Sequence, residues 1–70
     1  MKKTISYSSG VVFLEIEDAA TENAIEEIAK TGAEVDTANG NRVLGMLKCD
    51  FVKARELAKN GWLWRVESRR

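Results

Sequence analysis

One Asn-Gly pair, Asn39-Gly40, constrains the fold of this chain more than any other feature of the sequence. It lies inside "AEVDTANGNRVLGMLK", between two runs in which apolar and polar residues alternate. Both residues accept the positive φ angles of the tight turns that join antiparallel strands. The pair therefore predicts a β-hairpin, with Val43, Gly45 and Leu47 on one face of its second arm.

The segments before the hairpin predict a strand and then a helix. "VVFLEIE" alternates, with Val12, Leu14 and Ile16 on one face, as expected of a strand that covers a core. "DAATENAIEEIAKTG" has the apolar spacing of an amphipathic helix. Thr21 or Asp18 is the expected N-cap of this helix, because both side chains can accept a backbone N–H bond.

The segments after the hairpin repeat this plan in reverse order. Asp50 is placed to cap a second helix, "FVKARELAKN", and "WLWRVE" then predicts the last strand. Trp62 and Trp64 share one face of that strand, because residues two apart point to the same side. We expect both indoles to fill the core of a chain without disulfides; an outward orientation, which would make them contact residues, stays open.

The order strand, helix, strand, strand, helix, strand is that of the split βαβ plan. The predicted fold class is α+β: a ferredoxin-like βαββαβ domain, with a four-stranded antiparallel sheet and two helices on one face. Residues 1–70 form a single domain on this prediction. Residues 1–10 are a possible N-terminal extension, in which "ISYSS" either lengthens the first strand or lies against an edge.

The predicted sheet has one face that no helix of this chain covers. Its centre is apolar and its rim is acidic, a pattern typical of a partner-binding surface. Ordinary surface hydrophobicity and a homodimer through the same face remain alternatives. The residues that we expect to contact a partner are Phe13, Glu15, Glu34, Asp36, Leu44, Met46, Leu63, Arg69 and Arg70.

The composition argues against an enzyme, a metal site or a cofactor. The chain has no histidine and a single cysteine, Cys49, so it lacks the ligand clusters that zinc requires. It also has no glycine-rich phosphate loop and no carboxylate pair that stands out from a solvated face. An unpaired cysteine, with no signal peptide and no apolar run long enough for a membrane span, predicts a cytoplasmic protein without a membrane partner.

Nucleic-acid binding is the main alternative to protein binding. Residues 4–41 hold eight acidic residues and one basic residue, whereas residues 42–70 hold eight basic and three acidic residues. Arg42 and Gly45 fall where the RNA-recognition motif has a basic residue and a glycine, but its aromatic positions are filled by Leu44, Met46 and Cys49. The second helix also carries basic side chains that could meet phosphates, Lys53, Arg55 and Lys59.

Residues 11–70 resemble the propeptides and stand-alone inhibitors of subtilisin-type proteases. The resemblance rests on "VVFLEIE", "TGAEV" and "RVLGMLKCDFVKARELAKNGWLWRVESRR", which follow the order and spacing of that family. It implies that the open sheet face packs on an enzyme, that acidic side chains meet helix N-termini of the enzyme, and that the C-terminal tail enters the active-site cleft. The implied contacts are Phe13, Leu44 and Met46 for the face, Glu34 or Asp36 for the acidic contact, and Ser68, Arg69 and Arg70 for the tail.

The functional prediction is a non-enzymatic protein-binding module, a small inhibitor or regulator that docks on a larger enzyme. A protease and a host nuclease complex of the CRISPR-Cas type fit equally well as partners, the second for a phage-encoded, anti-CRISPR-like protein. The alternatives are a domain that binds RNA or single-stranded nucleic acid and a structural homodimer.

Overall fold

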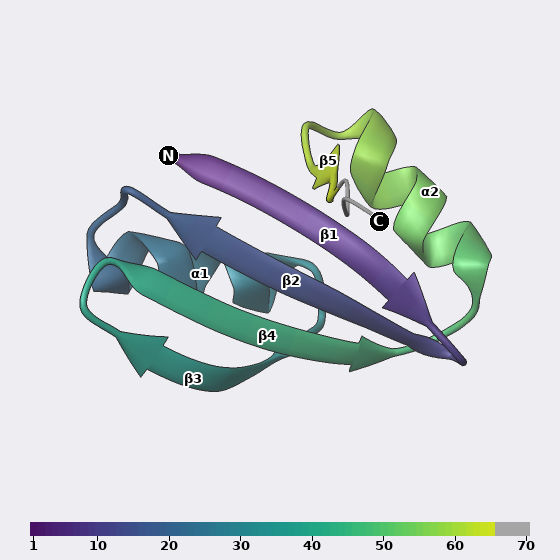
Figure 1. Ribbon diagram of the computed structural model, residues 1–70, viewed down its shortest axis with the longest axis horizontal. Coiled ribbons are helices and arrows are strands. Elements are labelled where there is room, and N and C mark those ends of the chain that lie inside the picture. Colours follow the sequence, from purple (N-terminus) through teal and green to yellow (C-terminus); the bar gives the residue numbers. More distant parts are fainter. Residues whose placement is uncertain (66–70) are drawn as a thin grey trace, which may run out of the picture.

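The computed structural model describes residues 1–65 of the chain. In this part of the chain, five strands form one sheet in the order β3-β4-β2-β1-β5, and two helices pack on it (Figure 1). All neighbouring strands are antiparallel except β1 and β5, which are parallel. The elements are β1 (Lys2–Ser8), β2 (Val11–Glu17), α1 (Thr21–Lys30), β3 (Glu34–Asn39), β4 (Arg42–Lys48), α2 (Phe51–Lys59) and β5 (Leu63–Trp64).

The structure confirms a small α+β domain with two helices, but the predicted four-stranded antiparallel sheet is wrong. The sheet has five strands and is mixed, because β1 lies between β2 and β5 (Figure 1). Without β1, the remaining order β3-β4-β2-β5 is the one expected of the predicted ferredoxin-like plan. The N-terminal segment therefore neither lengthens the first predicted strand nor lies at an edge; it is an inserted strand.

A tight turn at Ser9-Gly10 explains this insertion. Both residues have positive φ, 48° and 82°, which is the backbone conformation of a two-residue hairpin loop. Ser8 pairs with Val11 across the turn, and β1 pairs with β2 along its whole length. Ile5 is fully buried in the core, so the insertion also adds apolar burial.

The predicted central hairpin is confirmed, with its turn one residue later than Asn39-Gly40. Asn39 still pairs with Arg42, so the two loop residues are Gly40 and Asn41. Gly40 has a φ of 65°, a backbone conformation that glycine adopts without steric strain. A β-bulge between Val35 and Thr37 interrupts the pairing of β3 with β4.

The N-cap predicted for the first helix is wrong, and the N-cap predicted for the second is confirmed. Ala20 occupies the N-cap of α1, and its methyl side chain cannot accept a capping hydrogen bond. The Thr21 hydroxyl donates to the Gly40 carbonyl at 2.9 Å. This bond ties the start of α1 to the β3–β4 turn. In α2 the Asp50 carboxylate accepts the Val52 N–H at 3.1 Å, as expected of a cap.

The core lies between the helices and one face of the sheet. Gly45 is required there, since a Cβ at this position would lie 2.7 Å from Cγ2 of Ile28 in α1. Trp62 is 4% exposed, which confirms its predicted place in the core. The buried apolar residues are Ile5, Val12, Leu14, Ile16, Ala24, Ile28, Ala33, Val43, Ala54, Leu57 and Trp62.

The second tryptophan closes the α2 side of the core without being buried itself. Trp64 pairs with Ile5 in register and so lies on the same side of the sheet as the helices. Its ring stacks on Phe51 with centroids 5.5 Å apart, and the Phe51 and Tyr7 rings form a T-shaped pair. Trp64 and Phe51 remain 40% and 47% exposed. The helix-facing orientation is thus confirmed, while full burial holds only for Trp62.

Candidate protein-binding face

The open face is the side of the sheet that neither helix covers in residues 1–65. Phe13 of β2 pairs in register with Met46 of β4, and the next open-face pair along these strands is Glu15 with Leu44. Phe13 is 41% exposed, while Leu44 and Met46 are half-buried. The structure thus brings together the three apolar residues predicted for this face, and we call Phe13, Leu44 and Met46 the apolar patch.

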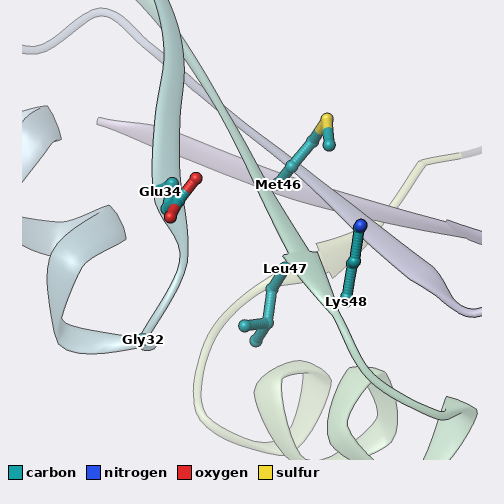
Figure 2. A pocket seen from close by; sticks show the side chains of 5 residues that line it. All are labelled: Gly32, Glu34, Met46, Leu47 and Lys48. Carbon is teal, nitrogen blue, oxygen red and sulfur yellow. The ribbon is translucent and has the colours of Figure 1, made fainter.

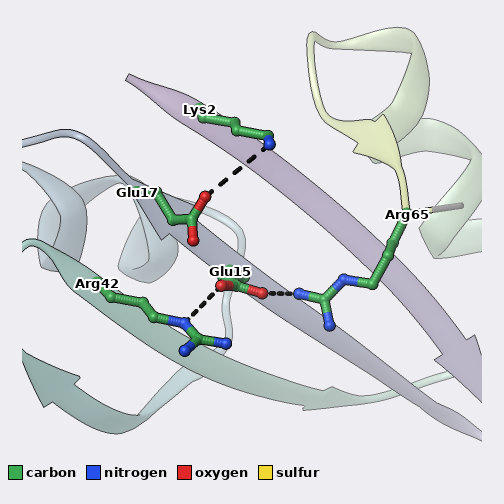
Figure 3. A network of polar contacts seen from close by, with 5 residues as sticks. All are labelled: Lys2, Glu15, Glu17, Arg42 and Arg65. Atoms are coloured by element: carbon green, nitrogen blue, oxygen red, sulfur yellow. Dashed lines mark hydrogen bonds and ion pairs between the residues drawn. The ribbon is translucent and has the colours of Figure 1, made fainter. Parts of the chain in front are cut away.

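Glu15 lies at the centre of the open face, on the middle strand of the sheet, yet only 6% of it is exposed. Arg42 donates from Nε to Oε2 of Glu15 at 2.6 Å. Arg65, just after β5, forms an ion pair with Oε1 of the same carboxylate (Figure 3). We call Glu15, Arg42 and Arg65 the ion cluster.

The two arginines explain how a carboxylate can be buried on an uncovered face. An ionised carboxylate removed from water needs paired charges and hydrogen bonds, and each oxygen of Glu15 has one guanidinium partner. The arginine side chains themselves keep contact with water, at 56% and 39% exposure. Glu15 was predicted as part of an exposed acidic rim; the structure places it beneath two arginines that sequence reasoning left out of the site.

One cavity joins the apolar patch to the ion cluster. It has a volume of about 190 Å³ and opens on the surface above β2 and β4. Apolar side chains and guanidinium groups therefore line the same space. Its lining residues are Phe13, Leu14, Glu15, Asp36, Arg42, Leu44, Gly45, Met46 and Arg65.

The predicted acidic residues of β3 lie beside the apolar patch. Glu34 pairs in register with Met46, and Asp36 falls at the β-bulge. Both are exposed. Glu34 and Met46 also line a second cavity of about 330 Å³, where Leu47 points to the opposite side from Met46 and Lys48 (Figure 2).

The remaining predicted contacts are less closely tied to this centre. Leu63 of β5 pairs with Thr4 and is 62% exposed, and it lines a cavity that also reaches the ion cluster. Arg69 and Arg70, with the implied tail residue Ser68, lie outside the described residues. Lys2 and Glu17 form a more exposed ion pair at 4.0 Å near one end of the face (Figure 3).

Two groups away from the open face have shifted pKa values. A hydrogen bond and the charge of Lys3 lower the pKa of Glu27, with a smaller contribution from Lys30. Burial raises the pKa of the Cys49 thiol, and the charge of Asp50 adds to this. A raised thiol pKa reduces the fraction of Cys49 that is present as thiolate at neutral pH. Within residues 1–65, no group of three or more His, Cys, Asp or Glu side chains could hold a metal ion.

Comparisons with protein-family models, with curated proteins and with solved structures found no match for this chain. The resemblance to subtilisin-type propeptides therefore stays a prediction. Among the described residues, no helix is both long and apolar enough to span a membrane.

Proposed function

We propose that this protein is a protein-binding module that docks on a larger partner through its open sheet face. The observation that carries the proposal is the apolar patch, which lies in the middle of a face that residues 1–65 leave uncovered. An apolar centre with charged residues around it is the usual composition of a transient protein interface. A small domain that covers a functional surface of an enzyme would also inhibit it, so the inhibitor role belongs to the same proposal.

The cavity above the patch has the size of a side-chain pocket. Sites for drug-sized ligands and cofactors usually enclose about 300 Å³ or more, whereas this cavity has about 190 Å³. It lies at the centre of the face, between Met46 and Arg65, where a partner side chain would be shielded from water. Such pockets hold the few residues that contribute most of the binding energy of an interface.

The charges on the open face favour a protein over a nucleic acid. Glu34 and Asp36 are exposed carboxylates beside the patch, and each would repel a phosphate backbone. Phe13 is the one aromatic residue on this face within residues 1–65, because Tyr7 and Trp64 lie on the helix side. Single-stranded nucleic acid is usually held by several stacked rings, which this face does not provide.

Photo-crosslinking in cells tests the proposal directly. Benzoyl-phenylalanine is incorporated in place of Phe13, where it resembles the native ring. A matched control carries the same group in place of Ile25, which is exposed on α1, away from the open face, to a similar extent of 38%. We expect ultraviolet light to link the variant at position 13, and not the control, to one heterologous protein.

The other outcomes separate the alternatives. Crosslinks to a second copy of this chain would replace the proposal by a homodimer, and crosslinks to RNA would replace it by nucleic-acid binding. Equal crosslinking from positions 13 and 25, or none from position 13, would show that the open face is not the docking surface.

A further inference from the structure

We infer that the partner inserts a carboxylate side chain between Arg42 and Arg65, with an apolar neighbour seated on the apolar patch. The inference rests on the proposed function and names the chemistry of the partner: an acidic segment of a protein. It uses the guanidinium groups of the ion cluster, which line the same cavity as Phe13, Leu44 and Met46.

The arginines keep hydrogen-bond donors for a ligand. A guanidinium group carries five N–H donors, and the contacts with Glu15 use one nitrogen of Arg42 and one of Arg65. In each group, one terminal nitrogen lies on the side away from the Glu15 carboxylate (Figure 3). A carboxylate that enters the cavity can therefore accept bonds from both arginines without displacing Glu15.

Glu15 holds the two arginines ready for such a ligand. Its side chain is 8% exposed and belongs to the central strand, so its own position is fixed by the sheet. An arginine that moves freely on a surface loses considerable side-chain entropy when it binds a ligand. The contacts with Glu15 already restrict Arg42 and Arg65 in the folded protein, so binding a carboxylate would cost them less entropy. Glu15 is therefore a positioning residue on this inference, and the arginines are the contacts.

The charge distribution selects a short anion over a polyanion. Glu15 neutralises only one of the two positive charges of Arg42 and Arg65, which leaves the ion cluster with a net positive charge. Asp36 lines the β3 side of the same cavity, and Glu34 lies in register beside Met46. A single carboxylate can approach the arginines while avoiding these acids, whereas a chain of phosphates would pass over them.

A peptide titration followed by NMR tests the inference. The probe is a soluble peptide, acetyl-Gly-Ser-Leu-Glu-Leu-Ser-Gly-amide, and its matched partner carries Gln in place of Glu. We expect the Glu peptide to shift the Nε–H signals of Arg42 and Arg65 in a saturable manner, with at least tenfold higher affinity than the Gln peptide. Arg42→Gln and Arg65→Gln should each lower the affinity for the Glu peptide several-fold, while the control Arg55→Gln, at an exposed residue of α2 away from the open face, should not.

The outcomes distinguish this inference from the proposed function. Equal binding of both peptides that is lost in Phe13→Ser would overturn the carboxylate contact and leave the docking face in place. Absence of saturable shifts with the Glu peptide would also overturn it, whatever the crosslinking at position 13 shows. A uridine oligomer that binds more tightly than the Glu peptide, and loses binding in Arg42→Gln, would replace the carboxylate by phosphate. Glu15→Gln should lower the affinity for the Glu peptide, but by less than Arg42→Gln does, as expected of a residue that positions the contacts. An unchanged or higher affinity in Glu15→Gln would show that Glu15 only competes with the ligand for the arginines and does not position them.

Discussion

The same strands form both faces of the sheet, but the two faces are stabilised by different interactions. On the helix side of β2, Val12, Leu14 and Ile16 are at most 1% exposed, and apolar contacts with both helices surround them. On the open side, Phe13 is 41% exposed, and the buried Glu15 forms ion pairs with two arginines. The helix side is held by apolar burial, which is strong and non-directional. The open side is held by directed polar contacts that leave an apolar patch accessible.

This difference shows how a small domain can be stable and still offer a binding surface. A chain of 70 residues buries a smaller fraction of its surface on folding than a larger domain does, so its margin of stability is small. Its stability must therefore come mainly from the helix side. The residues of the open side contribute less to stability, so they can serve the contact with a partner. The predictions below test this division, from the largest expected effect to the smallest.

Replacement of a leucine on each face gives the largest contrast. Leu14→Ala should lower the free energy of unfolding by about 2–5 kcal/mol, because Leu14 is 1% exposed and the change leaves a cavity. Leu44→Ala, on the open side, should cost about 1 kcal/mol, because Leu44 is only half-buried. Urea denaturation measures both. Equal losses for the two variants would contradict the division of roles between the faces.

The ion cluster predicts that removing its two arginines destabilises the protein more than removing Glu15 does. The double variant Arg42→Gln/Arg65→Gln leaves a buried carboxylate without a cation and should cost about 3 kcal/mol. Glu15→Gln leaves the arginines in contact with water and should cost only about 1 kcal/mol. Lys2→Gln, at the more exposed pair with Glu17, is the control and should change the stability by less than about 0.5 kcal/mol. A larger loss for Glu15→Gln than for the double arginine variant would argue against a buried, charged Glu15.

Gly45→Ala tests the close approach of α1 to the helix side of β4. The added methyl group would lie 2.7 Å from Cγ2 of Ile28 and 3.1 Å from the Glu34 carbonyl oxygen, so the helix or the strand must shift. Overpacking of this kind should destabilise the protein by about 1–3 kcal/mol. Thermal unfolding followed by circular dichroism measures the loss. An unchanged or higher melting temperature would show that α1 can move away from the sheet without penalty.

The smallest expected effect is a pH dependence from the Lys3–Glu27 contact between β1 and α1. Because Lys3 lowers the pKa of Glu27 in the folded protein, the contact stabilises the fold above the pKa of the unfolded state. This stabilisation is lost as the pH falls through the folded-state pKa. In Lys3→Gln, the pKa of Glu27 followed by carbon NMR should rise toward its ordinary value. The same pKa in both proteins would show that the contact does not form in solution.

The parts of the structure that could be predicted are those with a local cause. Asn39-Gly40 predicted the hairpin, because positive φ is a property of a few neighbouring residues. Asp50 predicted the start of α2 for the same reason, through a bond to an N–H two residues later. The apolar patch followed from strand alternation, because the side of Phe13 is fixed once Val12 and Leu14 face the core.

The parts that could not be predicted depend on residues far apart in the chain. β1 was missed as a separate strand because its alternation of buried and exposed residues is weak. Only one of its seven residues, Ile5, is fully buried. The Ser9-Gly10 turn was a local indication of a hairpin that the sequence interpretation did not use. Arg42 and Arg65 were missed from the site because both reach Glu15 from other parts of the sheet.

The sequence by itself determined the two helices, the central hairpin and which side chains of β2 and β4 face the core. These features follow from side-chain periodicity and turn chemistry, which act over a few residues. Only the tertiary structure decided that β1 lies between β2 and β5, and that Glu15 is buried beneath Arg42 and Arg65. The physical reason is that strand order and charge pairing depend on which distant edges and side chains meet, and no local pattern records that choice.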